Sequence, residues 1–264
     1  MKATVFLGGG RITGALLSGL RLAGYSQPIV VHDRHAAKLR QLQRDFGVEV
    51  ERDLRRAVAK AGLLVIAVRP DTVRELLGDL GGLDRPLIAV SLAAGVPLAR
   101  LQRRLGPPVR WTRAMPSPTC RTGHGFTALA FSREISRADR KRLREFFAQV
   151  GTVLEIPEKK FDVFTATYSS SHGYHALAAL SNAGEKLGLD RSTALAAAAH
   201  ALAGGVMAFT ESKLPLETLI HEAATPGGIA STVMKTMDAA GYHRAVERGV
   251  RAGVARARAN ARRV

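Results

Sequence analysis

The sequence predicts an α/β protein with a doubly wound, mostly parallel sheet at the N-terminus, followed by an all-helical domain. Three observations predict it. Short apolar runs alternate with helical patterns up to residue 157, a run of glycines follows the first apolar run, and the chain beyond residue 160 is rich in Ala and Leu with no strand pattern. We therefore divide the chain into domains at 1–157 and 158–264.

Apolar runs and helical patterns alternate regularly in the first domain. The predicted strands are 3–7, 29–31, 63–68, 87–91, 109–113 and 127–131. Segments 11–24 and 35–46 have helical spacing, and glycines at 24 and 47 end them. Strands separated by helices form βαβ units, in which neighbouring strands run parallel.

The second domain contains a segment, 192–209, made almost entirely of Ala, Leu, Gly and Val. A helix that is apolar on every side must be surrounded by protein. About a hundred residues of such helices make a poor core alone, so we expect them to pack against a second subunit. This predicts a homodimer or higher homo-oligomer formed through the C-terminal helices. No apolar run approaches the ~20 residues of a membrane span, so we expect no membrane partner.

Cysteine usage and the N-terminal residues predict the compartment. Cys120 is the only cysteine, so no internal disulfide can form. The N-terminus passes directly into an apolar strand, without the pattern of a signal peptide. We expect a cytoplasmic protein.

The formal net charge is +17. Residues 1–157 hold 26 basic and 13 acidic side chains, so most of the excess lies where a phosphate-bearing cofactor would bind. The basic residues are scattered over helices that also carry acids, and aromatic residues make up only 5% of the chain. Stacking platforms for bases are therefore scarce, and we do not expect nucleic acid as a partner. An arginine-rich codon usage is the alternative explanation that needs no ligand.

Gly8-Gly9-Gly10 lies between the first predicted strand and helix, the position of the dinucleotide-binding turn of a Rossmann-type domain. Gly8 permits the tight bend, and Gly10 lets a pyrophosphate approach the helix N-terminus. The third glycine of the usual pattern is replaced by Thr13. We expect cofactor contacts from Gly8, Gly9, Gly10, Arg11, Ile12 and Thr13. A glycine turn used only for packing is the alternative.

The end of the second strand indicates which nicotinamide cofactor binds. Asp33 would bind a ribose 2′-hydroxyl and favours NAD, whereas Arg34 would pair with a 2′-phosphate and favours NADP. Arg11 and Lys38 add positive charge nearby, and a guanidinium suits phosphate well. We expect NADPH, with NADH as the alternative.

Five landmarks lie along the chain: Gly8-Gly9-Gly10, Ala67-Val68-Arg69-Pro70, the segment 90–96, Arg113-Ala114-Met115-Pro116 and Thr225-Pro226-Gly227-Gly228. In this order and spacing they resemble the pyrroline-5-carboxylate reductase family nearly end to end. The resemblance implies a Rossmann domain and an all-helical dimerisation domain whose helices interlace between two chains. It also implies an NADP-dependent oxidoreductase acting on C=N, which reduces pyrroline-5-carboxylate in proline biosynthesis.

The resemblance also implies roles for individual residues. Val68, Arg69, Pro70 and Ala93 would line the cofactor groove, and Met115 and Pro116 would lie beside the nicotinamide. The substrate-binding candidates are Ser117, Gly227, Gly228 and Ile229. A glycine pair before a helix is, by itself, a suitable site for a substrate carboxylate.

The chain departs from the family pattern around the substrate. Ser117-Pro118-Thr119 follows Met-Pro where the family has Asn-Thr-Pro, and Ile229-Ala230 replaces two threonines after the glycine pair. Two alternatives therefore stay open: a paralogue that reduces another cyclic imine, and a catalytically decayed dinucleotide-binding protein with a regulatory or scaffold role. A β-hydroxyacid dehydrogenase would need a lysine in the first long helix after the Rossmann domain, and 172–184 contains none.

Reduction of an imine also needs a proton donor. The catalytic candidates are Ser231, Thr232, His172 and Tyr174. His172 and His175 could share a helix face, but no cysteine or acid cluster accompanies them. We therefore expect no metal.

Overall fold

The computed structural model describes residues 2–262, which form two compact units. The first unit consists of the residues up to Thr167 together with those from Ala252 onward, and the second is Tyr168–Arg251. The division expected from the sequence, after residue 157, gave the whole remainder to the second domain. The structure instead groups 158–167 and 252–262 with the sheet.

The first unit is built on an eight-stranded sheet in which the strands run in the order β3-β2-β1-β4-β5-β6-β7-β8. The strands are β1 (Ala3–Leu7), β2 (Ile29–His32), β3 (Glu49–Glu51), β4 (Ala61–Ile66), β5 (Leu87–Ser91), β6 (Val109–Pro116), β7 (Gly125–Phe131) and β8 (Gly151–Glu155). All neighbouring strands are parallel except β6 and β7. The first six strands have the Rossmann order, which reverses between β1 and β4. The predicted fold class is confirmed.

The six strands predicted from apolar runs are all present, and two further strands were missed. β3 has only three residues, two of them glutamates, and it pairs with the edge of β2. β8 is only partly buried at the other edge of the sheet. Neither has the continuous apolar run of a central parallel strand, so the hydrophobic pattern could not identify them.

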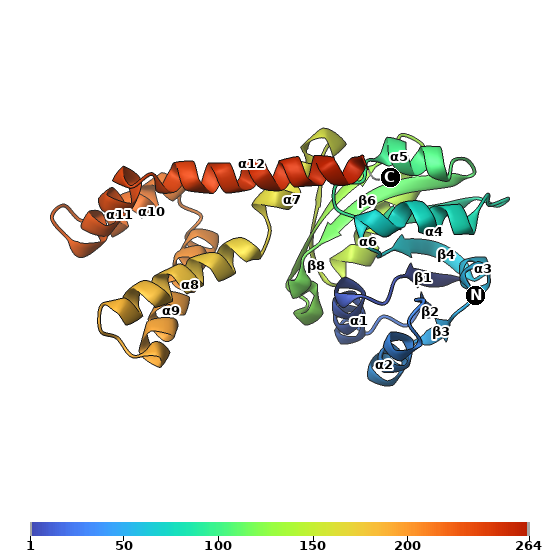
Figure 1. Cartoon of the computed structure of the whole chain (residues 1–264), viewed down its shortest axis with the longest axis horizontal. Coiled ribbons are helices and arrows are strands. Elements are labelled where there is room, and N and C mark those ends of the chain that lie inside the picture. Colours follow the sequence, from blue (N-terminus) through green and yellow to red (C-terminus); the bar gives the residue numbers. More distant parts are fainter. Residues whose placement is uncertain (1, 263–264) are drawn as a thin grey trace. The chain divides into compact units, whose positions relative to one another are not determined.

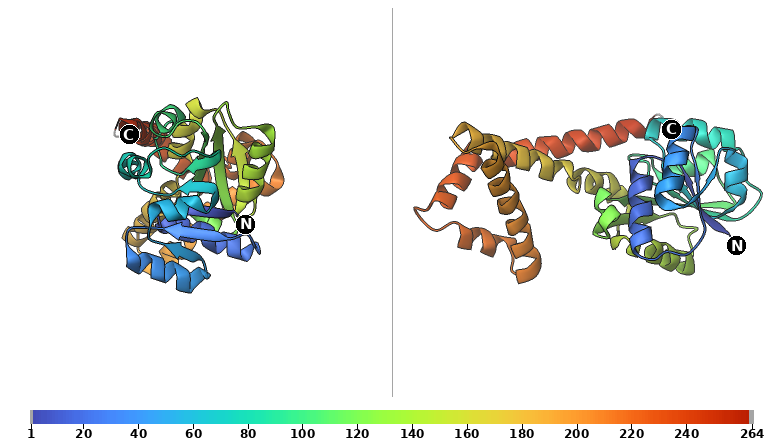
Figure 2. Two further views of the ribbon diagram at one scale, coloured as in Figure 1. Left: turned by 90° about the vertical axis from the view of Figure 1, so that its right-hand side faces the viewer. Right: turned by 90° about the horizontal axis from the view of Figure 1, so that it is seen from below.

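Helices cover both faces of this sheet (Figure 1 and Figure 2). The first-unit helices are α1 (Arg11–Leu22), α2 (Ala36–Phe46), α3 (Leu54–Ala59), α4 (Val73–Leu80), α5 (Leu98–Arg104), α6 (Arg137–Ala148) and α7 (Phe161–Thr167). α1, α2 and α6 pack on one face, and α3, α4 and α5 on the other. Side chains alternate along the strands, so Val5 and Leu7 of β1 join one core and Phe6 joins the other. Short 3-10 helices also occur: η1 (Pro70–Thr72), η2 (Pro118–Thr122) and η3 (Glu158–Lys160).

A buried arginine fixes the end of β6. Arg113 is 2% exposed, and its Nη2 donates to Asp162 Oδ1 at 2.8 Å. Its guanidinium lies 4.3 Å from the centroid of the Phe161 ring. Glu158, 3.5 Å from Arg113, also accepts a 2.6 Å hydrogen bond from the amide of Leu98 at the start of α5. The cluster joins three separate chain segments directly beside Met-Pro at the end of the strand.

The last described segment completes the first unit. It is the C-terminal part of α12 (Tyr242–Ala261), which packs on the loop after β5. Gly95 has φ +77°, and a Cβ there would lie 2.2 Å from the carbonyl oxygen of Ala257. Asn260 Nδ2 donates to the carbonyl of Ala94 at 3.3 Å. Glycine is therefore required at 95 both by backbone conformation and by this contact.

The second unit is entirely helical within the described residues. It contains α8 (Ser171–Lys186), α9 (Arg191–Ser212), α10 (Leu216–Ala223), α11 (Ile229–Ala239) and the first part of α12. Asp190 caps α9, accepting from the amides of Ser192 and Thr193. Hydrogen bonds from Ser192 and Thr193 hold the pKa of Asp190 far below its usual range.

The expectation about membrane-spanning length needs a correction. α9 is long and apolar enough to cross a membrane by length and composition, and only 11% of its apolar window is buried. The expectation failed because occasional polar residues interrupt the run without lowering its mean hydropathy below the range of a span. Large apolar side chains elsewhere in the second unit are also exposed, among them Ile220, Val233 and Val246.

We predict that Gly19→Ala in α1 destabilises the protein. A Cβ at Gly19 would lie 2.0 Å from the carbonyl oxygen of Cys120 in η2, so helix and loop would have to separate. We expect a loss of about 3 kcal/mol in the free energy of unfolding, measured by urea denaturation. The matched control is Gly14→Ala in the same helix, where the nearest atom lies 4.0 Å from the new Cβ. The free energy of unfolding of Gly14→Ala should rise by up to about 1 kcal/mol. Equal losses in Gly19→Ala and Gly14→Ala would contradict the packing argument.

Candidate functional site

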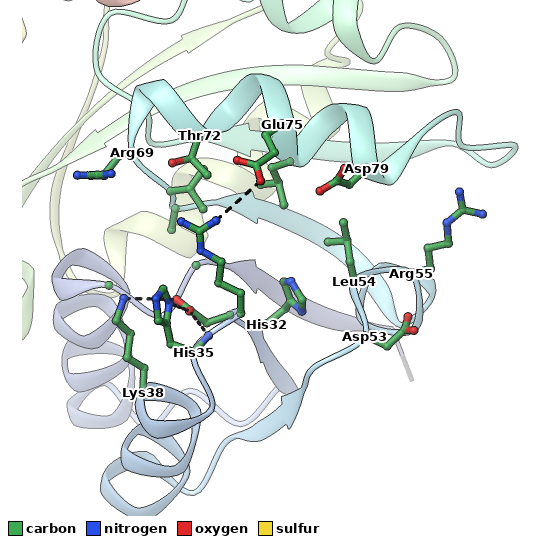
Figure 3. Close-up of a pocket in the computed structure, with 17 residues that line it drawn as sticks. His32, His35, Lys38, Asp53, Leu54, Arg55, Arg69, Thr72, Glu75 and Asp79 are labelled. Atoms are coloured by element: carbon green, nitrogen blue, oxygen red, sulfur yellow. Dashed lines mark hydrogen bonds and ion pairs between the residues drawn. The ribbon is translucent and has the colours of Figure 1, made fainter.

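The first unit contains a cavity of about 860 Å³ at the carboxyl ends of β1, β2 and β4 (Figure 3). Ligands of doubly wound sheets bind where the strand order reverses, which here is between β1 and β4. The lining residues are Gly8, Gly10, His32, Asp33, Arg34, His35, Lys38, Asp53, Leu54, Arg55, Ala67, Val68, Arg69, Thr72, Glu75, Leu76 and Asp79.

The glycine turn forms one side of this cavity. Gly8 has φ +112°, and a Cβ there would lie 2.6 Å from the carbonyl oxygen of Ala67. Its amide donates to the carbonyl of His32 at 2.7 Å, and its carbonyl accepts from Thr13 Oγ1 at 2.6 Å. Thr13, which replaces the usual third glycine, therefore braces the turn from within α1 and is itself buried.

The start of α1 has the features of an anion site. Gly10 is the N-cap residue, no side chain caps the helix, and its first turn contains no acid. A Cβ at Gly10 would meet nothing within 4 Å, so the turn presents open space there. Uncapped amides at a helix N-terminus bind phosphate groups, and these residues fit a pyrophosphate. Arg11 is exposed and Ile12 half-buried at the same end of the helix.

The Asp33 carboxylate, at the end of β2, joins the glycine turn to the β2–α2 turn. Oδ2 accepts from the Gly9 amide at 2.8 Å, and Oδ1 accepts from the His35 amide at 2.8 Å and contacts His35 Nδ1 at 2.9 Å. Lys38 Nζ lies 3.9 Å from Oδ2. Burial alone would raise the pKa of Asp33, but the hydrogen bonds from His35 and Gly9 and the charge of Lys38 together lower it. The side chain stays ionised, and its expected ribose contact remains a prediction.

Arg34 lies in the β2–α2 turn and lines the cavity, and its ion-pair partner Glu75 lies on α4 (Figure 3). Arg34 Nη1 lies 3.8 Å from Glu75 Oε1, and the two side chains are 66% and 64% exposed. His35 and Lys38 line the cavity from the same turn as Arg34. Three basic or titratable side chains are thus gathered beside the end of β2.

The remaining predicted cofactor residues fall into two groups. Val68 and Arg69 line the cavity, and Arg69 Nε lies 3.5 Å from Asp71 Oδ1. Outside the lining lie Gly9, Arg11, Ile12, Thr13, Pro70, Ala93, Met115 and Pro116. Met115 and Pro116 are paired in the sheet with β7, and Ala93 is buried after β5. Their cofactor contacts remain predictions.

Ser117, predicted to bind substrate, holds the chain after β6 in place. Its Oγ accepts from the amide of Phe126 at 2.9 Å and lies 2.7 Å from Thr119 Oγ1. The side chain is 8% exposed. Both hydrogen bonds are made within the segment that follows β6, and they stabilise its turn. The contact of Ser117 with substrate remains a prediction.

The second unit presents the predicted carboxylate site. Gly227 has φ +76°, and Gly228 is the N-cap of α11, with no side-chain cap and no acid in the first turn. Ile229 is 86% exposed. Of the two hydroxyls that follow, Ser231 is buried, and Thr232 Oγ1 donates to the carbonyl of Gly228 at 3.1 Å. Thr232 is therefore occupied within its own helix.

The other proton-donor candidates lie in the first turn of α8. His172 and Tyr174 both belong to this turn, and Tyr174 is 70% exposed. Within residues 2–262, no group of three His, Cys, Asp or Glu side chains is placed to hold a metal ion. The cofactor candidates thus belong to the first unit, and every catalytic candidate belongs to the second.

Several cavity residues were missed by the sequence reasoning. They come from the start of α3 (Asp53, Leu54, Arg55) and from η1 and α4 (Thr72, Glu75, Leu76, Asp79). These segments follow β3 and β4, and a position directly after a parallel strand is the sequence signal that could have identified their residues as cavity-lining. The signal was available only after β4, because β3 was not predicted.

Known proteins match both halves of the chain. Residues 4–95 match the family described as NADP oxidoreductase, coenzyme F420-dependent, and residues 158–260 match that described as pyrroline-5-carboxylate reductase dimerisation. A pyrroline-5-carboxylate reductase of Synechocystis sp. is 30% identical over 255 residues, 95% of each chain. That of Thermus thermophilus is 34% identical over 258 residues, covering 94% of this chain and 96% of the relative.

Solved structures share the fold. The pyrroline carboxylate reductase of Plasmodium falciparum, solved with NADP bound, has a TM-score of 0.87 at 20% identity and covers 98% of both chains. The enzyme of Streptococcus pyogenes has a TM-score of 0.89 at 21% identity, covering 97% of this chain and 98% of that one. Sheet order, glycine turn and cavity define a dinucleotide-binding protein of the Rossmann type, and the family match and curated relatives make it an oxidoreductase. Within that class, the chain belongs to the pyrroline-5-carboxylate reductase family.

We predict that Asp33→Asn lowers stability in a pH-dependent way. The lowered pKa of Asp33 means that its ionised form stabilises the fold. This contribution is complete above the usual carboxyl pKa of about 4 and is lost as the pH falls through the folded-state pKa. At about pH 7 we expect a loss of about 1–3 kcal/mol in the free energy of unfolding, shrinking below about pH 4.

Asp79→Asn is the matched control for that experiment. Asp79 lines the same cavity, but its carboxylate accepts no hydrogen bond within the described chain. Its substitution should change stability at about pH 7 by less than about 0.5 kcal/mol. A loss for Asp33→Asn no larger than that of the control would refute the bracing role.

Proposed function

We propose that this protein reduces pyrroline-5-carboxylate to proline with NADPH. The observation that carries the proposal is the full-length similarity to pyrroline-5-carboxylate reductases, combined with a cavity whose glycine turn and basic wall suit a phosphate-bearing dinucleotide. Residues 1–157 act as the cofactor domain, and 158–264 as the dimerisation and substrate domain. The match of 158–260 to the dimerisation family supports this division.

The cofactor residues hold three parts of NADPH. The amides at the start of α1 bind the pyrophosphate, since nothing else caps them. Arg34, with His35 and Lys38 on the same wall, binds the 2′-phosphate. Val68 and Arg69 flank the groove, and Met115 and Pro116 lie nearer the nicotinamide. When bound, the reduced nicotinamide supplies a hydride to the imine carbon.

The second unit positions the substrate. The N-terminus of α11, opened by Gly227 and Gly228, holds the substrate carboxylate by its amides and the helix dipole. One proton must reach the imine nitrogen for each hydride that reaches the carbon. Ser231 is the first candidate donor, because Thr232 already donates to its own helix. His172 and Tyr174 are the other candidates for this proton transfer.

The protein works as a homodimer or larger homo-oligomer in the cytoplasm. The exposed apolar surface of the second unit, α9 included, packs against a second copy of the chain rather than against lipid. The match of this region to a dimerisation family supports this assignment. We assign no nucleic-acid partner.

A related imine is the second candidate substrate. Ile229, 86% exposed, stands at the start of α11 where the family pattern has a hydroxyl side chain. An exposed apolar side chain beside a carboxylate site favours a substrate with a larger apolar ring.

We predict NADPH oxidation with pyrroline-5-carboxylate, followed by absorbance, and its loss in Gly10→Asp. The new carboxylate would face the pyrophosphate at the uncapped helix start, so NADPH binding should fall by at least about 100-fold. Turnover of a six-membered cyclic imine acid alone would identify the related substrate. NADPH binding without turnover of any cyclic imine would leave a non-enzymatic protein, and normal NADPH affinity in Gly10→Asp would contradict the pyrophosphate assignment.

We predict that Arg34→Ala weakens NADPH far more than NADH. A lost charge-assisted contact with the 2′-phosphate should raise the NADPH Kd about 10- to 100-fold, while NADH lacks that group and should change less than about threefold. Fluorescence titration measures both. Arg69→Ala, on another wall of the cavity, is the control, and it should affect both cofactors alike. Equal losses for both cofactors in Arg34→Ala would remove Arg34 from phosphate recognition.

A further inference from the structure

The cavity wall formed by α4 carries an acidic side chain that contacts Arg34. Glu75, on α4 and labelled in Figure 3, has its Oε1 3.8 Å from Arg34 Nη1. The two come from different segments, one from the β2–α2 turn and the other from α4. The guanidinium proposed to bind the 2′-phosphate is thus paired with a carboxylate.

Two of the other three acids in the cavity lining accept hydrogen bonds from backbone amides. Asp33 accepts from Gly9 and His35, and Asp53 caps α3 by accepting from the Arg56 amide at 2.8 Å. Both therefore serve the backbone that shapes the cavity. Glu75 is the acid that contacts the guanidinium of Arg34.

The pair between Arg34 and Glu75 can exchange partners. Both side chains are about two-thirds exposed, and such surface pairs contribute little stability because water screens them. A phosphate offers Arg34 a more highly charged partner with bidentate geometry. Binding of the phosphate therefore requires Arg34 to leave Glu75.

We propose that Glu75 is a specificity-determining residue, which competes with the 2′-phosphate for Arg34 and so limits the preference for NADPH over NADH. This inference rests on the proposed cofactor function. Arg34 supplies the selective attraction, and Glu75 opposes it. NADH carries no phosphate at this position, so Glu75 has little effect on its binding.

The test is direct titration of NADPH and NADH with Glu75→Gln, which keeps the side-chain size and removes the charge. We expect NADPH to bind roughly three- to fivefold tighter and NADH to change less than about twofold, because the phosphate no longer has to displace a solvent-screened ion pair from Arg34. 2′,5′-ADP and 5′-AMP serve as fragments that differ in the same phosphate. The gain for 2′,5′-ADP should match that for NADPH.

Two variants separate competition from a general charge effect. Asp79→Asn, one helical turn further along α4 in the same cavity lining, should change the NADPH Kd less than about twofold. In an Arg34→Ala background, Glu75→Gln should gain less than about twofold. A gain of equal size in Asp79→Asn, or one that persists without Arg34, would overturn the competition.

The direction of the change in NADPH affinity is a further test of the proposal. Weaker NADPH binding in Glu75→Gln would show that Glu75 presents Arg34 to the phosphate, and unchanged binding would show no role; either result overturns the proposal. If wild-type protein binds neither cofactor, it is the proposed function that fails. If both cofactors bind but the ratio of their dissociation constants is unaltered in Glu75→Gln, only this inference is contradicted.

Discussion

The bend at Gly8 is the constraint on which the site depends. The chain must turn immediately after β1 in a space where a Cβ would lie 2.6 Å from the Ala67 carbonyl oxygen. Because the turn is this close to the end of β4, the glycine loop and the β4–α4 loop form neighbouring walls of one cavity. Thr13 and Asp33 then secure the turn from α1 and from the end of β2. A helix N-terminus follows directly, so backbone geometry alone creates the place for a diphosphate.

Two neighbouring charged residues of the cavity, Asp33 and Arg34, differ in burial. Asp33 is buried and ionised, and it accepts hydrogen bonds from the backbone amides of the two turns that it holds together. Arg34, the next residue, is exposed and forms an ion pair with Glu75 of α4. Neighbouring residues with opposite charge thus differ in their surroundings, since Asp33 shapes the cavity, whereas Arg34 pairs with a side chain and carries the proposed contact with the 2′-phosphate. The sequence alone left Asp33 and Arg34 as competing indications of NAD and NADP, and the structure adds that Asp33 is buried whereas Arg34 is exposed.

The strongly apolar strands and the glycine turn could be predicted because each is a local pattern with one structural meaning. β3 and β8 could not, since three residues rich in glutamate, or a half-exposed edge strand, lack that pattern. Glu75 and Asp53 were missed for a different reason. Their approach to Arg34 or to the cavity depends on how α3 and α4 pack, and nothing in their local sequence marks them. Arg113 was noticed as part of a motif, but its burial against Phe161, Asp162 and Glu158 depends on a chain segment some 45 residues away.

The contact between Gly95 and Ala257 bears on the order in which the protein is made. The loop after β5 emerges from the ribosome long before α12, and the whole helical unit is synthesised in between. On the nascent chain, the loop after β5 therefore stays uncovered until residues 252–262 have been synthesised. Proteolytic removal of that late segment from finished molecules would return the loop to its state during translation.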